Sequence, residues 1–244
     1  MLSLDLANSS LLSPEELSAL YLSAKIALFA TLVSLPLAML LAWTLARHQF
    51  RGKFIVEAAL QLPMVLPPVV LGYLLLVAFG TQGFIGRYLQ QWFDIQLAFN
   101  WKGAVLASII MAFPLMVQPI KLAFQMVDHR LEQAAATLGA KPWQVFLTIS
   151  LPLASSGILI GSILCFTRSL GEFGATMTFV GNIPGETRTI PLAIYSFIQQ
   201  PGGETAAARL VVLSMLLAFA ALLANYWITQ RYQQKIGYLS RAQL

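Results

Sequence analysis

The stretch "EQAAATLGAKPWQVFLTISLP", residues 132–152, is a polar segment between two long apolar runs. Upstream lies "GAVLASIIMAFPLMVQPI", residues 103–120, and downstream lies "LASSGILIGSILCF", residues 153–166. Within the segment, Gly139 permits a left-handed helix end, and Pro142 suits the first turn of a second helix. The pattern predicts a helix–turn–helix elbow that joins two apolar helices.

The composition excludes an ordinary soluble protein. The 244 residues are 58% hydrophobic and only 10% charged, whereas about 25% of residues are charged in an average soluble domain. The net charge of +5 comes from basic residues that flank apolar runs, which is typical of orientation in a bilayer and not of nucleic-acid binding. We therefore expect a protein that contacts the lipid bilayer and no nucleic acid. Its one cysteine, Cys165, lies in an apolar run and cannot form an internal disulfide.

Five apolar stretches are long enough to cross a bilayer core, which needs ~20 helical residues. They are residues 26–46, 58–86, 103–120, 142–167 and 210–230, and in the fourth stretch the part after Pro152 is expected to form the span. Residues 189–203 are short and end in turn residues, so we expect an interfacial or re-entrant segment there, and a sixth span stays open. The expected fold is an all-α integral membrane bundle of about five transmembrane helices, forming one domain over residues 1–244.

The first span is expected to be a mature helix and not a cleaved signal peptide. Ser13 suits the N-cap position, Pro14 the first helical position, and Glu16 completes a capping box. The charges before the span are acidic, whereas a signal peptide begins with basic residues.

Lysine and arginine counts predict the orientation of the chain. With five spans, nine basic residues fall on the side that holds the elbow and five on the other side. The first set is Arg47, Arg51, Lys53, Lys121, Arg130, Lys141, Arg231, Lys235 and Arg241. The positive-inside rule places this set in the cytoplasm. We therefore expect a cytoplasmic elbow and C-terminus, and an N-terminus on the outer side.

The sequence carries no recognisable catalytic or metal-binding motif. No phosphate-binding loop, dinucleotide fingerprint or paired-histidine zinc motif occurs, and the histidines His48 and His129 lie in loops without neighbouring ligands. We therefore expect no catalytic residue, no metal ligand and no cofactor bound by the chain. A pore or a permease subunit is the class that remains.

Two features inside the spans are candidates for a translocation path or gate. The first is the proline pair Pro67 and Pro68, which interrupts an apolar run and predicts a broken helix. The second is the segment 168–179, where Arg168 and Glu172 are spaced to form an ion pair at membrane depth. Hydroxyls of Ser169, Thr176 and Thr178 in the same segment could line an aqueous route. The alternatives are a kink that only fits the bundle and an ion pair that only joins helices.

The elbow resembles the cytoplasmic loop of the permease subunits of bacterial ABC importers. Their pattern is E-A-A, three residues, Gly, nine residues, then I-x-L-P, and here the same spacing holds, with Gln in place of the first Glu and Glu132 just before it. The resemblance implies that the loop, residues 127–152, couples the chain to a separate ATPase subunit, which binds ATP and Mg²⁺. The residues that carry this expectation are Glu132, Gln133, Ala134, Ala135, Gly139, Ile149, Leu151 and Pro152.

Further stretches resemble the molybdate branch of these permeases. They are "LPMVLPPVVLGYLLL", "FPLMV", "RSLGEFGATMTFVGNIPGETRTIPLAIY" and "QQPGGETAAARL", within residues 54–210. "LGEFGA" is also found in sulfate permeases, so it indicates only an oxyanion importer. The resemblance implies a type I ABC importer fold in the bacterial inner membrane. It also implies a homodimer, two cytoplasmic ATPase subunits and a periplasmic molybdate-binding protein.

The polar, turn-rich segment 181–189 is a candidate docking surface for that binding protein, through Asn182, Glu186 and Arg188. A plain solvated loop is the alternative for this segment. For the whole chain, the alternatives are a sulfate-type oxyanion permease and an autonomous channel or secondary transporter. Tungstate also stays open as a substrate.

Overall fold

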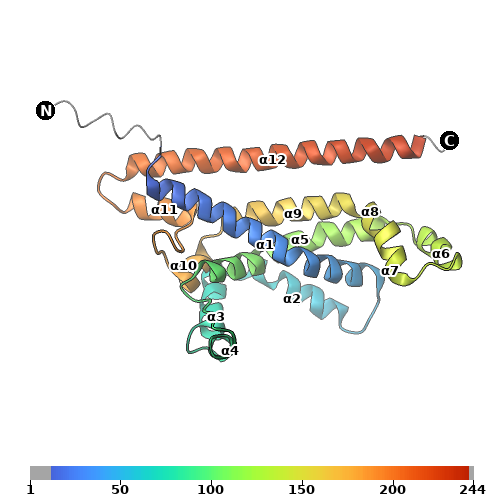
Figure 1. The fold of residues 1–244 in the computed structure, drawn as a ribbon, viewed down its shortest axis with the longest axis horizontal. Helices are drawn as coiled ribbons and strands as arrows, with labels where there is room; N and C mark the ends of the chain where they lie inside the picture. The colour runs from blue at the N-terminus through green and yellow to red at the C-terminus, as the bar shows by residue number, and fades with distance from the viewer. Residues whose placement is uncertain (1–11, 242–244) are drawn as a thin grey trace.

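The computed structural model describes residues 12–241, and within that range every regular element is a helix. The helices are α1 (Pro14–Arg47), α2 (Lys53–Val65), α3 (Pro68–Phe79), α4 (Phe84–Phe93), α5 (Trp101–Met126), α6 (His129–Thr137), α7 (Pro142–Val145), the π-helix η1 (Phe146–Ser150), α8 (Leu151–Leu153), α9 (Ser155–Leu170), α10 (Gly174–Val180), α11 (Ile190–Ile198) and α12 (Glu204–Arg241). Figure 1 shows α1, α5, α9 and α12 extending along the long axis of the molecule, with α6 and α7 together at one end. The predicted all-α architecture is confirmed. The predicted positions of the two chain termini fall outside the described residues.

The start of α1 follows the predicted capping box. The Ser13 hydroxyl accepts the Glu16 N–H at 3.2 Å, and the Glu16 carboxylate accepts the Ser13 N–H at 2.6 Å. Pro14 occupies the first helical position. From there α1 continues to Arg47 without interruption, and Pro36 lies inside it.

Three helices are long and apolar enough to span a membrane: α1, α5, and α12 over Glu204–Ala224. Two further pairs pass the same test together but are bent, α2 with α3 by 110° and residues 142–153 with α9 by 69°. Counting each bent pair as one span gives five, which agrees with the number expected from the sequence. The short segment at 189–203 forms α11, Ile190–Ile198, whose 9 residues are too few to cross a bilayer.

The break between α2 and α3 has a local cause. A residue that precedes proline is disfavoured in the helical conformation, and both Leu66 and Pro67 precede one. Leu66 has ψ 141° and Pro67 has ψ 132°, so the chain is extended between the two helices. By contrast, α5 remains one helix through Pro114 and Pro119.

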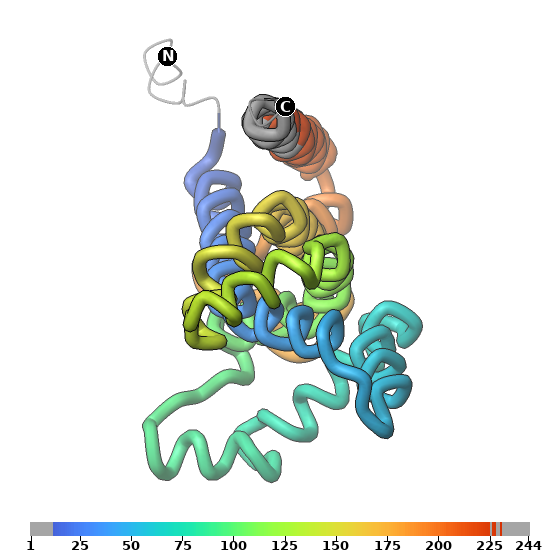
Figure 2. Tube along the Cα trace, turned by 90° about the vertical axis from the view of Figure 1, so that its right-hand side faces the viewer, coloured from blue at the N-terminus to red at the C-terminus, as the bar shows by residue number. Residues whose placement is uncertain are grey.

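Small residues set the closest helix approaches. A Cβ atom on Gly157 or Gly161 of α9 would lie 2.5 Å from a backbone oxygen of α5, so these glycines let α9 lie directly against α5. On the other side of the bundle, a Cβ on Gly72 of α3 would lie 2.7 Å from the Ala175 oxygen of α10. Figure 2 shows the turn into α3 and α4 lying to one side of the main bundle. The core therefore has two parts that share α1 and α5: one part adds α3 and α10, and the other adds α9 and part of α2.

Candidate functional site

The elbow is a helix pair joined by a left-handed turn. The α6 helix begins after Asp128, whose carboxylate accepts the Arg130 N–H at 2.9 Å. At the other end Gly139 has φ 87°, and the Ala140 N–H donates to the Ala135 oxygen at 3.1 Å. This is the hydrogen-bond pattern of a Schellman motif. The predicted left-handed helix end is confirmed, and α7 begins at Pro142 as expected.

The elbow exposes several large apolar side chains among polar ones. Leu138 is 89% exposed and Trp143 is 60% exposed, and Leu131 and Leu147 are also exposed. No residue of α6 is buried. Large apolar side chains exposed on a loop can serve as anchors that fill pockets of another protein. Of the residues predicted for coupling, Gln133, Ala134, Gly139 and Pro152 are exposed, while Glu132, Ala135, Ile149 and Leu151 are half-buried.

Glu132 points into the protein and not toward the outer surface of the elbow. Its Oε1 accepts hydrogen bonds from Arg47 Nη2 at 2.8 Å and from Ser150 Oγ at 2.5 Å. Its Oε2 lies 3.2 Å from His129 Nδ1. Sequence analysis did not find Arg47 and Ser150 as partners, because they lie 85 and 18 residues away along the chain.

The two candidates for the translocation path lie near each other, where α3 meets α10. A Cβ on Gly174 at the start of α10 would be 2.8 Å from Pro68 Cβ, so the proline break lies against the segment that follows α9. The predicted ion pair forms, with Arg168 Nη1 2.7 Å from Glu172 Oε2. Glu172 lies beyond the end of α9, however, so the pair bridges a helix terminus instead of lying along one helical face. Its Oε1 also accepts the Ala175 N–H at 3.1 Å.

The three predicted hydroxyls lie in the same region but differ in their bonding. Thr176 donates to the Phe173 oxygen and Thr178 to the Gly174 oxygen, both at 2.9 Å. Ser169 Oγ is buried and has no hydrogen-bond partner among the described residues. Arg168, with a side chain 31% exposed, is therefore the group of this segment best able to meet an anion.

The candidate docking residues of segment 181–189 are bonded to other groups of the chain. Asn182 donates to Ser196 of α11 at 2.6 Å and accepts from Arg188 Nε at 3.0 Å. Glu186 accepts from Asn100 at 3.1 Å. The side chains that remain free for contact are at the tip of the turn, residues 183–185, which are exposed.

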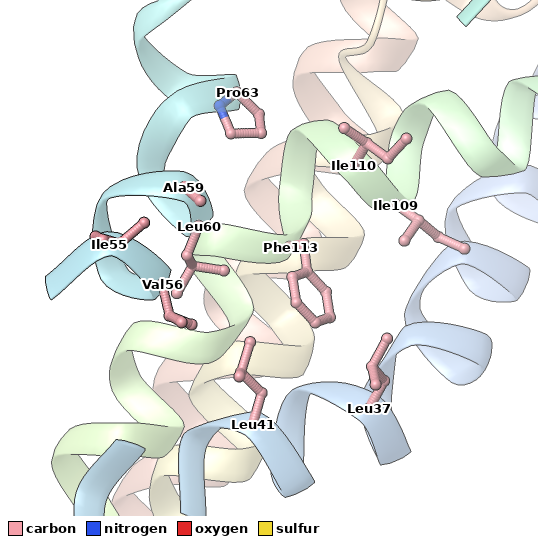
Figure 3. Close-up of a pocket in the computed structure, with 10 residues that line it drawn as sticks. All are labelled: Leu37, Leu41, Ile55, Val56, Ala59, Leu60, Pro63, Ile109, Ile110 and Phe113. Carbon is pink, nitrogen blue, oxygen red and sulfur yellow. The ribbon is translucent and has the colours of Figure 1, made fainter. Parts of the chain in front are cut away.

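A separate groove of about 490 Å³ lies between α1, α2 and α5. Figure 3 shows its lining, which comprises Leu37, Leu41, Ile55, Val56, Ala59, Leu60, Pro63, Ile109, Ile110 and Phe113. All ten side chains are apolar, so they offer no hydrogen-bond donor or charge to an anion. This groove is not a candidate oxyanion site.

Together these features define a polytopic helical membrane protein with a broken span and an elbow at one end that exposes large apolar side chains. The chain belongs to the family described as the binding-protein-dependent transport system inner membrane component, whose model matches residues 34–234.

The relatives cover nearly the whole chain. The chain is 56% identical over 222 residues to the molybdenum transport system permease protein ModB of Haemophilus influenzae, covering 91% of this chain and 97% of that protein. It is 55% identical over 227 residues to ModB of Escherichia coli K12, covering 93% and 99%. Among solved structures, a bacterial ABC transporter involved in the import of alginate matches with TM-score 0.73 at 16% identity, over 90% of this chain and 80% of that one. That likeness confirms the expected permease fold.

Proposed function

We propose that this chain is the membrane-spanning permease subunit of an ATP-driven importer that carries molybdate across the bacterial inner membrane. The observation that carries the proposal is the 56% identity to a molybdenum transport permease over 91% of the chain. The chain's own residues agree with it, because the described segments contain a broken span and a docking elbow. The chain itself has no catalytic role in this proposal.

The proposed assembly is a homodimer of this chain with two cytoplasmic ATPase subunits and a periplasmic molybdate-binding protein. ATP and Mg²⁺ bind to the ATPase subunits. The exposed Leu138 and Trp143 support an ATPase contact at the elbow, since apolar anchors of this kind fill pockets at protein interfaces. The basic-residue count supports an elbow and C-terminus in the cytoplasm and an N-terminus in the periplasm.

The binding protein delivers the dianion to the outer end of the bundle, near segment 181–189. Its tip, residues 183–185, is exposed, while Asn182, Glu186 and Arg188 are bonded to other groups. We assign these three residues the role of fixing the turn, so that docking falls to the tip.

Closure of the ATPase dimer moves the elbow, and the elbow moves the helices that follow it. The eight residues named above for coupling, from Glu132 to Pro152, are assigned this role, and all of them are exposed or half-buried. The region where α3 meets α10 is assigned to the gate. It holds the proline break and the Arg168–Glu172 pair. Because Arg168 is already paired with Glu172, its attraction for the dianion is partly offset and the ion is not trapped, as conduction requires.

The test is oxyanion-stimulated ATP hydrolysis in proteoliposomes that contain the permease, the ATPase and the binding protein. Molybdate, tungstate and sulfate are compared at equal concentration. Stimulation by molybdate with none by sulfate supports the proposal, and tungstate shows whether both metals' oxyanions are carried. Stimulation by sulfate alone favours the sulfate-type permease. Purification of the chain without any ATPase, together with unaided uptake, favours an autonomous channel.

A further inference from the structure

The two halves of the elbow are attached to the bundle by different means. In the half formed by α7 and η1, the Phe146 ring packs edge-on against Trp43 of α1, at 5.7 Å between centroids. The α6 half has no buried residue, so apolar burial does not hold it. It is attached instead through Glu132, whose Oε1 accepts from Arg47 Nη2 at 2.8 Å.

Arg47 lies at the centre of this attachment. It is the last residue of α1, and its side chain is only 7% exposed. The same Nη2 also donates to the Val127 oxygen at 3.1 Å, at the end of α5. The carboxylate that it binds accepts in turn from Ser150 Oγ at the end of η1. One buried guanidinium and one carboxylate therefore join α1, the α5–α6 junction, α6 and η1.

The surroundings of this pair leave room for movement. A cavity of about 320 Å³ lies between α1 and the elbow, and Arg47, Glu132 and Ser150 all line it. The Nε of Arg47 is buried and has no hydrogen-bond partner within residues 12–241. The guanidinium thus has a spare donor with which to follow the carboxylate when the elbow shifts.

Because the pair is shielded from water, its attraction is stronger than that of an exposed pair.

We propose that Arg47 is a positioning residue that transmits displacement of the elbow to α1 through Glu132; this inference rests on the coupling role proposed for the elbow. Movement of α6 then shifts α1, which packs along α5 and α9 in the bundle core. Without the Arg47–Glu132 pair, the same movement reaches α1 indirectly, through the chain between α5 and α6 and through the Phe146–Trp43 contact. Glu132 therefore binds Arg47 within the permease. The neighbouring Gln133 is exposed and is available to contact the ATPase.

The experiment measures molybdate ions imported per ATP hydrolysed, in proteoliposomes that hold the permease, the ATPase and the binding protein. The variants are Arg47→Gln, Glu132→Gln and the charge swap Arg47→Glu with Glu132→Arg. Arg51→Gln is the matched control, because Arg51 is exposed four residues further along the chain and loses the same charge. The amount of folded complex is measured for each variant by size-exclusion chromatography, with ATPase co-purification.

Each single variant is expected to lower the import per ATP about fivefold, which lies within the range of coupling energies known for residues remote from a ligand. The swap is expected to restore at least half of it, and the control to change nothing. Unchanged import per ATP in both single variants overturns the inference, and so does a swap that recovers no more than the single variants. If the single variants lower the amount of complex, recovery of that amount and of the import per ATP in the swap still supports the Arg47–Glu132 link. Failure of the swap to recover either quantity contradicts it. A wild-type complex that imports no molybdate rejects the proposed function itself, before any variant is compared.

Discussion

Replacing Gly139 by valine should uncouple ATP hydrolysis from transport without unfolding the bundle. Gly139 has φ 87° and ends the first half of the elbow. A Cβ at this position would meet no atom within 4 Å, so the Cβ itself causes no clash. The main cost is the left-handed backbone conformation, which a β-branched residue strongly disfavours.

The size of the effect follows from that conformation. An L-residue pays about 1–2 kcal/mol in the left-handed region, and a β-branched residue pays at the upper end or above. Leaving the region gives up the Ala140 N–H bond to the Ala135 oxygen, worth about 1 kcal/mol. A bias of about 2 kcal/mol changes the population of the native turn roughly thirtyfold. Because α6 has no buried residue, the elbow can rearrange while the helix core stays packed.

The assay is molybdate import per ATP hydrolysed in the reconstituted complex, with thermal melting of the purified complex alongside. Gly139→Asn should keep most of the coupling, because asparagine tolerates positive φ far better than valine. Gly202→Val is the matched control at the opposite end of the bundle, with φ 79° and equally open space around a Cβ. Normal import per ATP in Gly139→Val would refute the reasoning, as would equal losses in the asparagine and valine variants.

Three further predictions address the elbow surface, a helix crossing and a buried hydrogen bond. Leu138→Asp should abolish co-purification of the ATPase while the chain stays in the membrane, because Leu138 is an apolar side chain 89% exposed on the elbow. Full retention of the ATPase would place the contact elsewhere. Gly72→Val should lower the melting temperature of the complex by forcing α3 away from Ala175, whose oxygen lies 2.7 Å from a Cβ built at Gly72. Such overpacking costs about 1–3 kcal/mol, and an unchanged melting temperature would show that the two helices do not approach this closely. Ser23→Ala should cost about 1–3 kcal/mol, because the Ser23 hydroxyl accepts the buried Ile190 N–H at 2.7 Å; melting in detergent measures the loss, and wild-type stability would contradict the bond.

Features with local causes were predictable from the sequence. The start of α1 follows from Ser13, Pro14 and Glu16, which act within four residues of each other. The left-handed turn follows from Gly139, and the helix break from the two prolines after Leu66. In each case, the residue type itself restricts the backbone, so no distant contact is needed.

Features that depend on distant residues were not predictable in the same way. Nothing in the sequence near Glu132 indicates that its carboxylate turns inward to Arg47. The short helix α4, Phe84–Phe93, was also not predicted, because most of it lies after Arg87, beyond the apolar run 58–86, in a stretch to which the sequence analysis assigned no element. The 110° angle between α2 and α3 depends on how α3 packs against α10, and a proline pair predicts only that a break occurs.

The docking segment illustrates the same limit. Its polar residues suggested an exposed surface, but Asn182, Glu186 and Arg188 are bonded to Ser196, Asn100 and Glu15. Polar character predicts hydrogen bonding, and whether the partner is water, another protein or the same chain depends on the tertiary fold. Arg188 thus has partners on two sides, in Asn182 and Glu15.

The most direct test of the account compares molybdate uptake into vesicles that contain this chain alone with uptake into vesicles that also contain the ATPase, the binding protein and ATP. The account predicts uptake only in the complete system, and its loss when ATP is replaced by a non-hydrolysable analogue. Sustained molybdate uptake by the chain alone, without ATP, would contradict it.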